Sequence, residues 1–412
     1  MIGAGALKVT AIAATAGLGG TERLLLDLAA RAFEYDIALR LLVPQSGPLV
    51  TILNEIGVPA EVVAAPEAML AGPVESAPLL TGGASLLGVM GWARRLAVHP
   101  FWQETDLVYT VAFKAHLACA LRRKHPVVWH LHEMPPERMG AAWRAMARRL
   151  ADGLIAPSRA AAEAWTVREP DSKDAAVASR FGLPVSKPPE LEVIPSGVDL
   201  DRFRPRERSY WIHRRLGLDP SARLLGTPVS FTRWKGALEA IRAFSSIAGR
   251  HPVAHLLVSG PAPYETGVDP KFREEVEAAV RSAGSRVHLF SFEPKAELVY
   301  PELDLVLHYP VRPEAFGRVL VEAMACAVPV IAAAEGGALE VLDRGGGWLV
   351  RPRDWEALAS ALEDFLKLPA EERRRMGEAG RRAAEDRYSA RVFAREVARV
   401  LRRVAGSGAQ PG

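Results

Sequence analysis

The sequence has few cysteines and no disulfide pattern. Among 412 residues only Cys119 and Cys326 are cysteines, and each lies in an alanine-rich apolar stretch. Two such residues are typical of buried, reduced thiols rather than of a disulfide or a metal pair. Since reduced thiols persist in a reducing compartment, we predict a cytoplasmic protein.

Long apolar runs and blocks of like charge are also missing. No stretch of about 18 uncharged apolar residues occurs, which argues against a membrane-spanning helix. The first residues lack the charged and apolar segments of a signal peptide, so we expect none. The formal net charge is only +4, without a run of five or six basic residues, so we predict no nucleic-acid partner. A mild positive balance suits anionic small molecules or an anionic membrane surface.

Short apolar segments alternate with amphipathic ones along most of the chain. This alternation predicts βαβ units with parallel sheets. A first series of expected strands covers 7–14, 36–44, 106–112, 126–133, 153–158 and 191–198, and a second covers 222–231, 254–260, 286–292, 303–309 and 328–334.

The two series predict two doubly wound Rossmann-like α/β domains that face a central cleft. A segment rich in Pro, Arg and Asp near 203–210 is the expected linker. The predicted organisation is an N-terminal Rossmann-like domain, a C-terminal Rossmann-like domain, a helix packing back on the domain pair and a disordered tail, at 1–203, 204–386, 387–405 and 406–412.

One stretch, RPEAFGRVLVEAMACAVPVIA from Arg312 to Ala332, combines two acids with a glycine and a following strand. A helix is predicted from about Phe316. The backbone N–H groups of Phe316, Gly317 and Arg318 would then be unpaired first-turn donors, which form an anion site.

The two acids of this stretch flank the expected anion site. Glu314 lies just before the helix, and Glu322 lies about two turns into it. A diphosphate with a sugar at each end has that layout. Taken singly, either glutamate is better explained as a solvated acid near a helix start; the complete arrangement favours a binding site.

This stretch resembles the Glu-x7-Glu region of the retaining glycosyltransferases of family four, which have the GT-B fold. The resemblance implies that Glu314 contacts hydroxyls of the donor sugar and that Glu322 contacts the ribose. EGGALE, at 335–340, is similar to the next loop of the family. Ala327 stands where the family normally has glycine, a change that we expect to be tolerated.

The segment TRWKGALEAIRAF resembles the Lys-Gly segment of the same family and implies that Lys235 binds the donor diphosphate. The family usually has an arginine five residues earlier, where this chain has Ser230. Either Arg233 replaces that arginine, or fewer charges neutralise the leaving group. The second case weakens the case for catalysis.

In the first half, TAGLGGTERLLLDLA follows the first expected strand and opens a helix. Its G-x-G-G pattern is not the G-x-G-x-x-G of dinucleotide-binding enzymes, which argues against an oxidoreductase. The resemblance implies that Gly19 and Gly20 lie over the donor diphosphate. It also implies that the histidine ending the strand at 126–133, which we take as His132, faces the donor sugar.

Other residues of the first half carry weaker hypotheses. His130 and His132 share one face of a strand, but without a third ligand at useful spacing we predict no metal. Lys114 and His116 follow another strand and could border an acceptor pocket. Two Trp-, Met- and Arg-containing helices, near 86–102 and 137–153, are either core with solvated arginines or a peripheral contact with the cytoplasmic face of a membrane.

We therefore predict a metal-independent enzyme that moves a sugar from a UDP- or GDP-linked donor to a hydroxyl of a glycan, lipid or small-molecule acceptor, with retention of configuration. Glu314, Lys235 and His132 are the predicted catalytic residues. No cofactor beyond the nucleotide-sugar co-substrate is expected. The alternative is a catalytically silent GT-B-like protein that binds a nucleotide or glycan.

Overall fold

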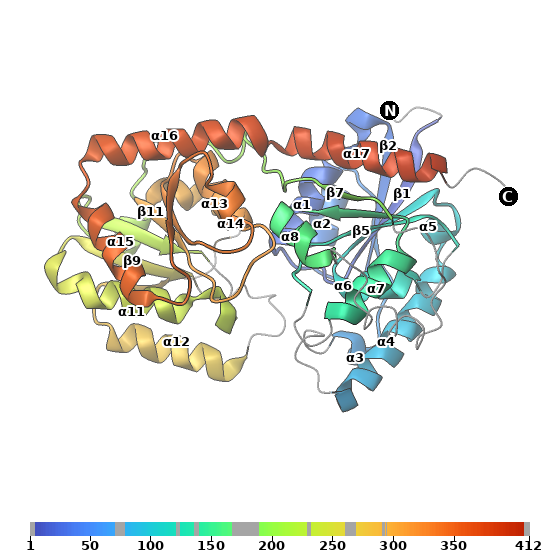
Figure 1. Ribbon diagram of the computed structural model, residues 1–412, viewed down its shortest axis with the longest axis horizontal. Helices are drawn as coiled ribbons and strands as arrows, with labels where there is room; N and C mark the ends of the chain where they lie inside the picture. The colour runs from blue at the N-terminus through green and yellow to red at the C-terminus, as the bar shows by residue number, and fades with distance from the viewer. Residues whose placement is uncertain are drawn as a thin grey trace. The chain divides into compact units, whose positions relative to one another are not determined.

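Parallel strands form one sheet in each of two units of the chain (Figure 1). The computed structural model describes residues 5–70, 79–120, 124–135, 140–166, 189–228, 232–259, 269–290, 293 and 295–407. Unit 1 comprises Met1–Gly197 and Ala390–Gly412, and unit 2 comprises Val198–Ser389.

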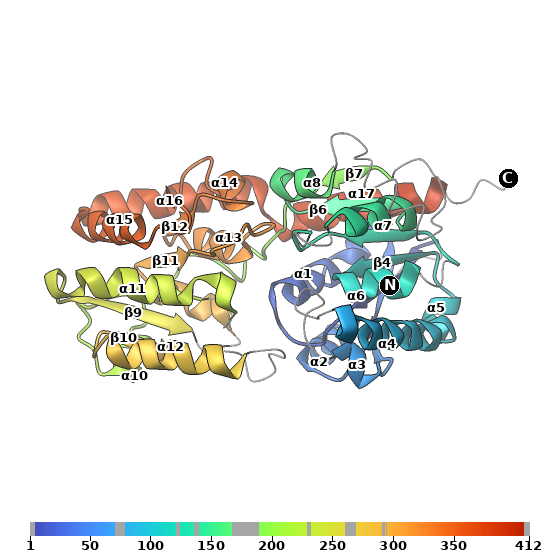
Figure 2. The ribbon, with the colours of Figure 1, turned by 60° about the horizontal axis from the view of Figure 1, so that its bottom comes forward.

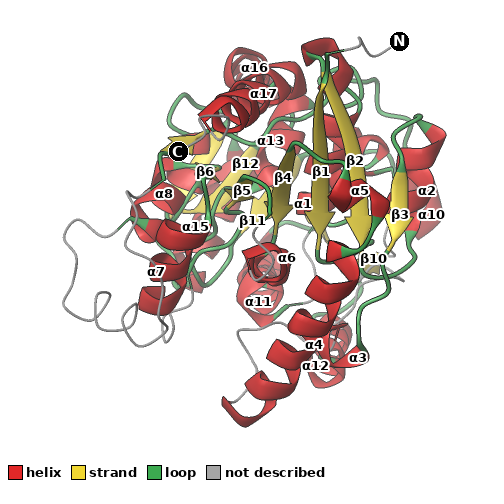
Figure 3. Ribbon diagram, turned by 90° about the vertical axis from the view of Figure 1, so that its right-hand side faces the viewer, coloured by secondary structure: helices red, strands yellow, loops and turns green. Residues whose placement is uncertain are grey.

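The sheet of unit 1 has the strand order β3-β2-β1-β4-β5-β6-β7, and every neighbouring pair is parallel (Figure 3). The chain crosses from β3 back to β4 on the other side of β1, so the order reverses between β1 and β4. The strands are β1 (Leu7–Ala13), β2 (Ile37–Val43), β3 (Ala60–Val62), β4 (Leu107–Val111), β5 (Val127–His130), β6 (Gly153–Ala156) and β7 (Leu191–Val193).

Helices cover both faces of this sheet because its strands carry apolar side chains on both sides. One face packs against α1 (Gly20–Ala29), η1 (Ala32–Tyr35), α2 (Pro48–Glu55) and α17 (Ala390–Ser407). The other packs against α3 (Glu67–Leu70), α4 (Leu79–Ala97), α5 (Pro100–Gln103), α6 (Phe113–Ala120), α7 (Gly140–Leu150) and α8 (Arg159–Trp165).

Unit 2 repeats this architecture with the parallel strand order β10-β9-β8-β11-β12-β13. Here the order reverses between β8 and β11. The strands are β8 (Arg223–Thr227), β9 (Ala254–Ser259), β10 (Val287–Phe290), β11 (Leu305–His308), β12 (Val330–Ala333) and β13 (Gly347–Val350).

The sheet of unit 2 is also covered on both faces (Figure 2). One face packs against α11 (Ala237–Ile247), α12 (Pro270–Ser282) and α15 (Trp355–Lys367). The other packs against α10 (Trp211–Leu216), α13 (Arg318–Ala325), α14 (Ala338–Val341) and α16 (Ala370–Arg387). Short helices are η3 (Arg233–Lys235), η4 (Ala248–Arg250), η5 (Ala296–Leu298) and η6 (Tyr300–Glu302).

The prediction of two doubly wound α/β units is confirmed, but the unit boundaries differ from the predicted 203/204 and 386/387. The chain enters unit 2 at Val198, whose N–H donates to the carbonyl of Tyr388 over 2.8 Å. Phe203, expected to end the first domain, is buried against Tyr300 of unit 2. The last helix begins at Ala390 and packs on unit 1. These tertiary contacts join segments far apart in sequence, so local composition did not reveal them.

Ala327 adopts a left-handed backbone conformation with φ +57°, which explains why glycine would suit this position. An L-residue in this region costs about 1–2 kcal/mol, partly offset because alanine restricts the unfolded chain more than glycine does. We expect Ala327→Gly to raise the free energy of unfolding by about 1 kcal/mol in chemical denaturation. Ala361→Gly, inside α15, should lower it by a similar amount. A loss of stability in the first variant would contradict this reading.

Candidate active site

The predicted donor-binding residues of unit 2 gather where the strand order reverses. Lys235 ends η3, in the connection that leaves β8, and Glu314 lies in the loop that leaves β11. Because β8 and β11 are neighbouring parallel strands, both connections start at the same edge of the sheet. Open α/β sheets bind ligands at this point, outside the carboxyl ends of the strands.

Lys235 and Glu314 form an ion pair across this edge. Nζ of Lys235 lies 2.5 Å from Oε1 of Glu314, and the two side chains are 18% and 21% exposed. Nε2 of His308, the last residue of β11, lies 2.6 Å from the other oxygen, Oε2. One carboxylate is therefore held between a lysine and a histidine that come from two different strand ends.

The two basic neighbours control the charge of Glu314. Burial alone would raise the pKa of this carboxyl, but the nearby charges of Lys235 and His308 and the hydrogen bond from Lys235 outweigh burial and hold the pKa well below its usual range. Glu314 is therefore ionised at neutral pH and is a weak proton acceptor. It suits hydrogen bonding to hydroxyl groups better than proton abstraction.

This depressed pKa predicts a pH-dependent contribution to stability. A carboxyl with a lowered folded-state pKa stabilises the fold above its unfolded-state pKa, and the stabilisation is lost as the pH falls toward the folded-state pKa. We expect the difference in unfolding free energy between the wild type and Glu314→Gln to be greatest near pH 6 and to shrink below about pH 4. Denaturant titrations across this range measure it, and a pH-independent difference would contradict the ion pair.

The helix after this loop starts later than predicted. It begins at Arg318 rather than Phe316, because Gly317 adopts the left-handed conformation, with φ +88° and ψ +58°. The first-turn N–H groups are therefore those that start at Arg318, and the amides of Phe316 and Gly317 belong to the loop. The ring of Phe316 is buried and packs edge-on against Tyr388. That the amides of 316–318 bind a phosphate stays a prediction.

Glu322 lies on α13 and is only 5% exposed. Its Oε1 accepts a hydrogen bond from Nε of Arg318 over 2.9 Å, and its Oε2 accepts one from the hydroxyl of Tyr300 over 2.8 Å. Each carboxylate oxygen can accept a second hydrogen bond. Contact of Glu322 with a ribose therefore stays a prediction, and any such contact would add to the bonds that Glu322 already accepts or replace one of them.

Arg233 lies near Lys235 in sequence but is engaged elsewhere. Its guanidinium donates to both oxygens of Glu275 on α12, over 2.7 and 2.6 Å, and its side chain is 54% exposed. To bind a diphosphate as predicted, Arg233 would have to leave this pair. Ser230, which stands where the family has arginine, lies outside the described residues.

Two glycines of the loop after β12 support the backbone of Glu314. The N–H of Gly337 donates to the carbonyl of Glu314 over 2.9 Å. Gly336 has φ +61°, and a Cβ there would lie 2.3 Å from the same carbonyl oxygen. The Gly-Gly pair that follows Glu335 is therefore required by close backbone approach.

The predicted residues of unit 1 also follow strand ends. Gly19 is the N-cap of α1, in the loop that leaves β1, and Gly20 is the first residue of that helix. Glu22, in the first turn, accepts a hydrogen bond from Thr15 over 3.0 Å, and burial raises the pKa of this glutamate. Contact of Gly19 and Gly20 with a diphosphate stays a prediction.

The histidines near the end of β5 form a compact cluster. The half-buried ring of His132 lies 3.9 Å from that of His130, measured between ring centroids. His130 is fully buried and hydrogen-bonded to Tyr109. Burial, with His132 and His116 nearby, holds the pKa of His130 well below its usual range, so this ring is neutral at physiological pH. Contact of His132 with a sugar stays a prediction.

Lys114 and His116 on α6 are both occupied within unit 1. Lys114 donates to the carbonyl of Met69. His116 is hydrogen-bonded to Thr110 over 2.6 Å and stacks on Trp129, and burial followed by the nearby His132 lowers its pKa to about 3. These contacts give His116 a structural role.

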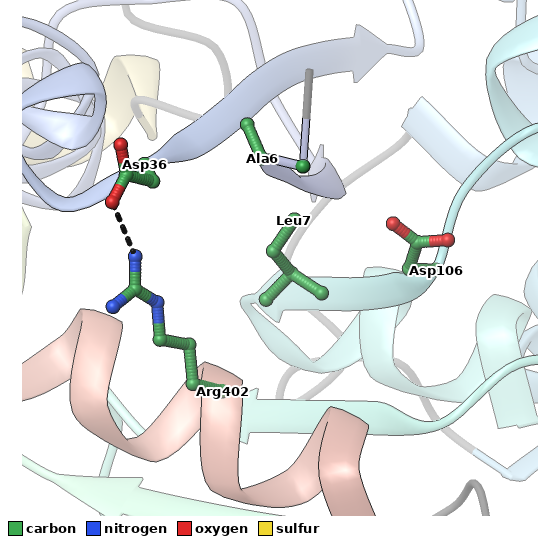
Figure 4. Close-up of a pocket in the computed structure, with 6 residues that line it drawn as sticks. Ala6, Leu7, Asp36, Asp106 and Arg402 are labelled. Carbon is green, nitrogen blue, oxygen red and sulfur yellow. Dashed lines mark hydrogen bonds and ion pairs between the residues drawn. The ribbon is translucent and has the colours of Figure 1, made fainter. Parts of the chain in front are cut away.

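A pocket of about 450 Å³ lies at the edge of the unit 1 sheet where the strands begin, opposite the edge where they end (Figure 4). Leu7, Asp36 and Asp106 line it where β1, β2 and β4 begin, and Arg402 of α17 reaches Asp36 at 3.3 Å. None of the predicted site residues lines it.

In the described part of the chain, no group of three His, Cys, Asp or Glu side chains could hold a metal, and no helix is long and apolar enough to cross a membrane.

Residues 212–383 match the family model of the glycosyl transferases group 1. The match lies within unit 2, so this part of the chain is similar to the glycosyl transferases group 1 family. The matched residues contain Lys235, His308, Glu314 and Glu322, so the ion-paired cluster lies in the part of the chain that is similar to this family.

Two curated glycosyltransferases are similar to part of this chain. It is 36% identical over 202 residues to the D-inositol 3-phosphate glycosyltransferase of Segniliparus rotundus, covering 47% of this chain and 42% of that protein. It is 28% identical over 231 residues to the GDP-mannose-dependent monoacylated alpha-(1-6)-phosphatidylinositol monomannoside mannosyltransferase of Corynebacterium glutamicum, covering 54% and 58%. The match thus spans about half of each relative.

Solved structures share the fold over almost the whole chain. Anabaena Alr3699/HepE in complex with UDP and glucose superposes with a TM-score of 0.75 at 22% identity, covering 96% of this chain and 100% of that one. An alpha,alpha-trehalose 6-phosphate synthase from Burkholderia multivorans superposes with a TM-score of 0.74 at 15% identity, covering 98% and 100%. The two units together have the GT-B fold.

The sequence did not single out two residues that contact the predicted acids. His308 ends an apolar strand immediately before the loop of Glu314, and a polar residue at a strand end is the signal that could have found it. Tyr300 lies in η6 and reaches Glu322 across 22 residues. No local pattern marks that contact.

Proposed function

We propose that this chain transfers a sugar from a nucleotide diphosphate donor to a hydroxyl acceptor, with retention of configuration and without a metal. The observation that carries the proposal is the placement of Lys235 against the paired Glu314 at the switch point of a group 1 glycosyltransferase unit. This arrangement puts a cation for a diphosphate beside an acceptor for sugar hydroxyls.

The charge state of Glu314 supports the retaining route. A carboxylate held by two basic groups is a poor base, so the acceptor proton needs another destination. In a front-face displacement the acceptor oxygen bonds to the anomeric carbon while the bond from that carbon to the phosphate oxygen breaks. The leaving phosphate oxygen then takes the acceptor proton, and no protein nucleophile is needed.

In this mechanism Lys235 stabilises the negative charge that develops on the diphosphate. The helix α13 follows the loop that leaves β11, so its first N–H groups start at the same edge of the sheet and would add a positive helix terminus. Glu314 orients the sugar through its hydroxyls. These groups take the place of a divalent metal.

The identity of the sugar donor and acceptor is a further part of the proposal. One relative is named for GDP-mannose and phosphatidylinositol monomannoside, another for inositol 3-phosphate, and a structural neighbour holds UDP and glucose. We propose a UDP- or GDP-linked donor and a polyol or glycolipid acceptor. The cytoplasm, with contact to the membrane surface that carries such a lipid, is the proposed location.

A donor panel tests the proposal. UDP-glucose, UDP-N-acetylglucosamine and GDP-mannose are incubated with the protein and with inositol phosphate or phosphoinositide acceptors. We expect thermal stabilisation by one nucleoside diphosphate and release of that diphosphate from its sugar. Stabilisation without release in any combination would favour the silent binder, and absence of both would contradict nucleotide-sugar binding.

Glu322→Gln gives a second test, directed at the nucleotide. The substitution keeps the shape of the side chain but removes the charge that would accept ribose hydroxyls, so we expect the Kd for the stabilising nucleoside diphosphate to rise about tenfold. Titration calorimetry measures this value. Because Glu322 is buried with Arg318, the unfolding free energy is recorded in parallel. An unchanged Kd in a folded variant would remove Glu322 from the nucleotide site.

A further inference from the structure

His308 stands at the centre of the site without a predicted role. It is the last residue of β11 and is 1% exposed. Nε2 of its ring lies 2.6 Å from Oε2 of Glu314, an ion-pair distance, although the N–H is not aligned for a hydrogen bond. Neither ring nitrogen has an aligned hydrogen-bond partner among the described residues.

Other buried histidines of the chain do have such partners. Nε2 of His213 is hydrogen-bonded to the carbonyl of Ala222 over 3.0 Å, and His116 is hydrogen-bonded to Thr110. Buried polar groups without an aligned partner are uncommon in native structures and call for an explanation. His308 differs from these residues because its neighbour is a carboxylate at the edge where open α/β sheets generally bind ligands.

Glu314 is anchored from two directions. Lys235 reaches Oε1 from the connection after β8, and His308 approaches Oε2 from the end of β11. The two anchors differ in conformational freedom. The ammonium group of Lys235 lies at the end of a flexible side chain on a short helix, whereas the backbone of His308 is held in a β-strand. Gly317 lies beside the ring, where a Cβ would be 3.4 Å from Nε2, an ordinary van der Waals contact.

A bound diphosphate would compete with Glu314 for Lys235. When the ammonium group turns to the phosphates, one oxygen of Glu314 is released toward the sugar hydroxyls. His308 is then the anchor that keeps the carboxylate charged and oriented. We propose that His308 is a positioning residue that holds Glu314 for the sugar part of the donor. This inference rests on the proposed function and deepens it.

Three variants at this position separate positioning from folding. His308→Leu removes both nitrogens at similar volume. His308→Asn places an amide near the position of Nδ1 in the wild-type ring, and this side chain is too short to reach Oε2 of Glu314. His308→Gln places an N–H near the position of Nε2. Titration calorimetry of each variant with UDP, UDP-glucose, GDP and GDP-mannose, beside denaturant unfolding, compares the nucleotide with the nucleotide sugar.

We expect His308→Leu and His308→Asn to weaken the binding of the recognised nucleotide sugar about tenfold, while the Kd of the matching nucleoside diphosphate changes less than about twofold. His308→Gln should restore the Kd for the nucleotide sugar to within about threefold of the wild-type value. If the His308→Leu variant does not fold, the comparison of His308→Asn with His308→Gln tests whether His308 positions Glu314.

Two outcomes would overturn the inference. In the first, the variants weaken the binding of the nucleotide and of the nucleotide sugar equally. In the second, His308→Asn weakens the binding of the nucleotide sugar and His308→Gln does not restore it. Either result would make His308 a structural residue and would leave the proposed function intact. Wild-type binding of none of the four probes would instead contradict the proposed function, and the inference with it.

Discussion

Glu314→Gln is expected to lower the turnover of sugar transfer by about 10²–10³-fold, with little change in the Kd for the nucleoside diphosphate. The substitution keeps the size of the side chain but removes the charge that Lys235 and His308 hold in place. A preorganised charged group beside the reacting sugar contributes an effect of this order. Nucleotide binding should persist, because Lys235 and α13 are retained.

A matched control lies in the next loop. Glu335 pairs with Arg353 at 2.6 Å, and its side chain is 18% exposed, so Glu335→Gln removes a similarly paired carboxylate near the same edge of the sheet. Steady-state kinetics should show a change of less than about threefold for this variant. If both substitutions lowered turnover equally, the claim that Glu314 acts directly beside the reacting sugar would be wrong.

Gly236→Ala is expected to disrupt the loop that carries Lys235. Gly236 has φ +79°, and a Cβ there would lie 1.8 Å from the carbonyl oxygen of Tyr309. The left-handed conformation costs an alanine about 1–2 kcal/mol, and forced displacement of packed backbone costs a similar amount or more. We expect the free energy of unfolding to fall by about 3 kcal/mol and the Kd for a nucleoside diphosphate to rise at least tenfold.

Gly249→Ala is the control for this effect. Gly249 lies in η4, and a Cβ there would meet no atom within 4 Å. Denaturant unfolding should place this variant within about 0.5 kcal/mol of the wild type. Wild-type stability and nucleotide binding in Gly236→Ala would show that the loop does not hold Lys235 in the described geometry.

The repeated strand signals carried the fold prediction because each buried strand is a contiguous apolar segment. β1, predicted at 7–14, forms at Leu7–Ala13, and β11, predicted at 303–309, forms at Leu305–His308. The edge strands β3 and β13 were not predicted. β3 has three residues, two of them exposed, and Gly347–Val350 shows little burial, so neither has a strong apolar pattern.

The site could be predicted only as far as chain order constrains it. Residues after neighbouring parallel strands must lie near one another, which brings Lys235 and Glu314 together although 79 residues separate them. The pairing of Arg233 with Glu275 depends on where α12 lies against η3, and sequence spacing does not encode that packing. The start of α13 moved because Gly317 adopted a left-handed conformation that no neighbouring residue signals.

The most direct measurement is the affinity of UDP and GDP for the wild type and for Lys235→Met, determined by titration calorimetry at low ionic strength. The charge of Lys235 is the proposed anchor of the diphosphate, and methionine keeps the length of the side chain without that charge. We expect micromolar to millimolar binding of one nucleotide by the wild type and at least about tenfold weaker binding by the variant. Equal affinity in the two proteins, or no binding by the wild type, would contradict the role of Lys235 as the anchor of a nucleotide diphosphate.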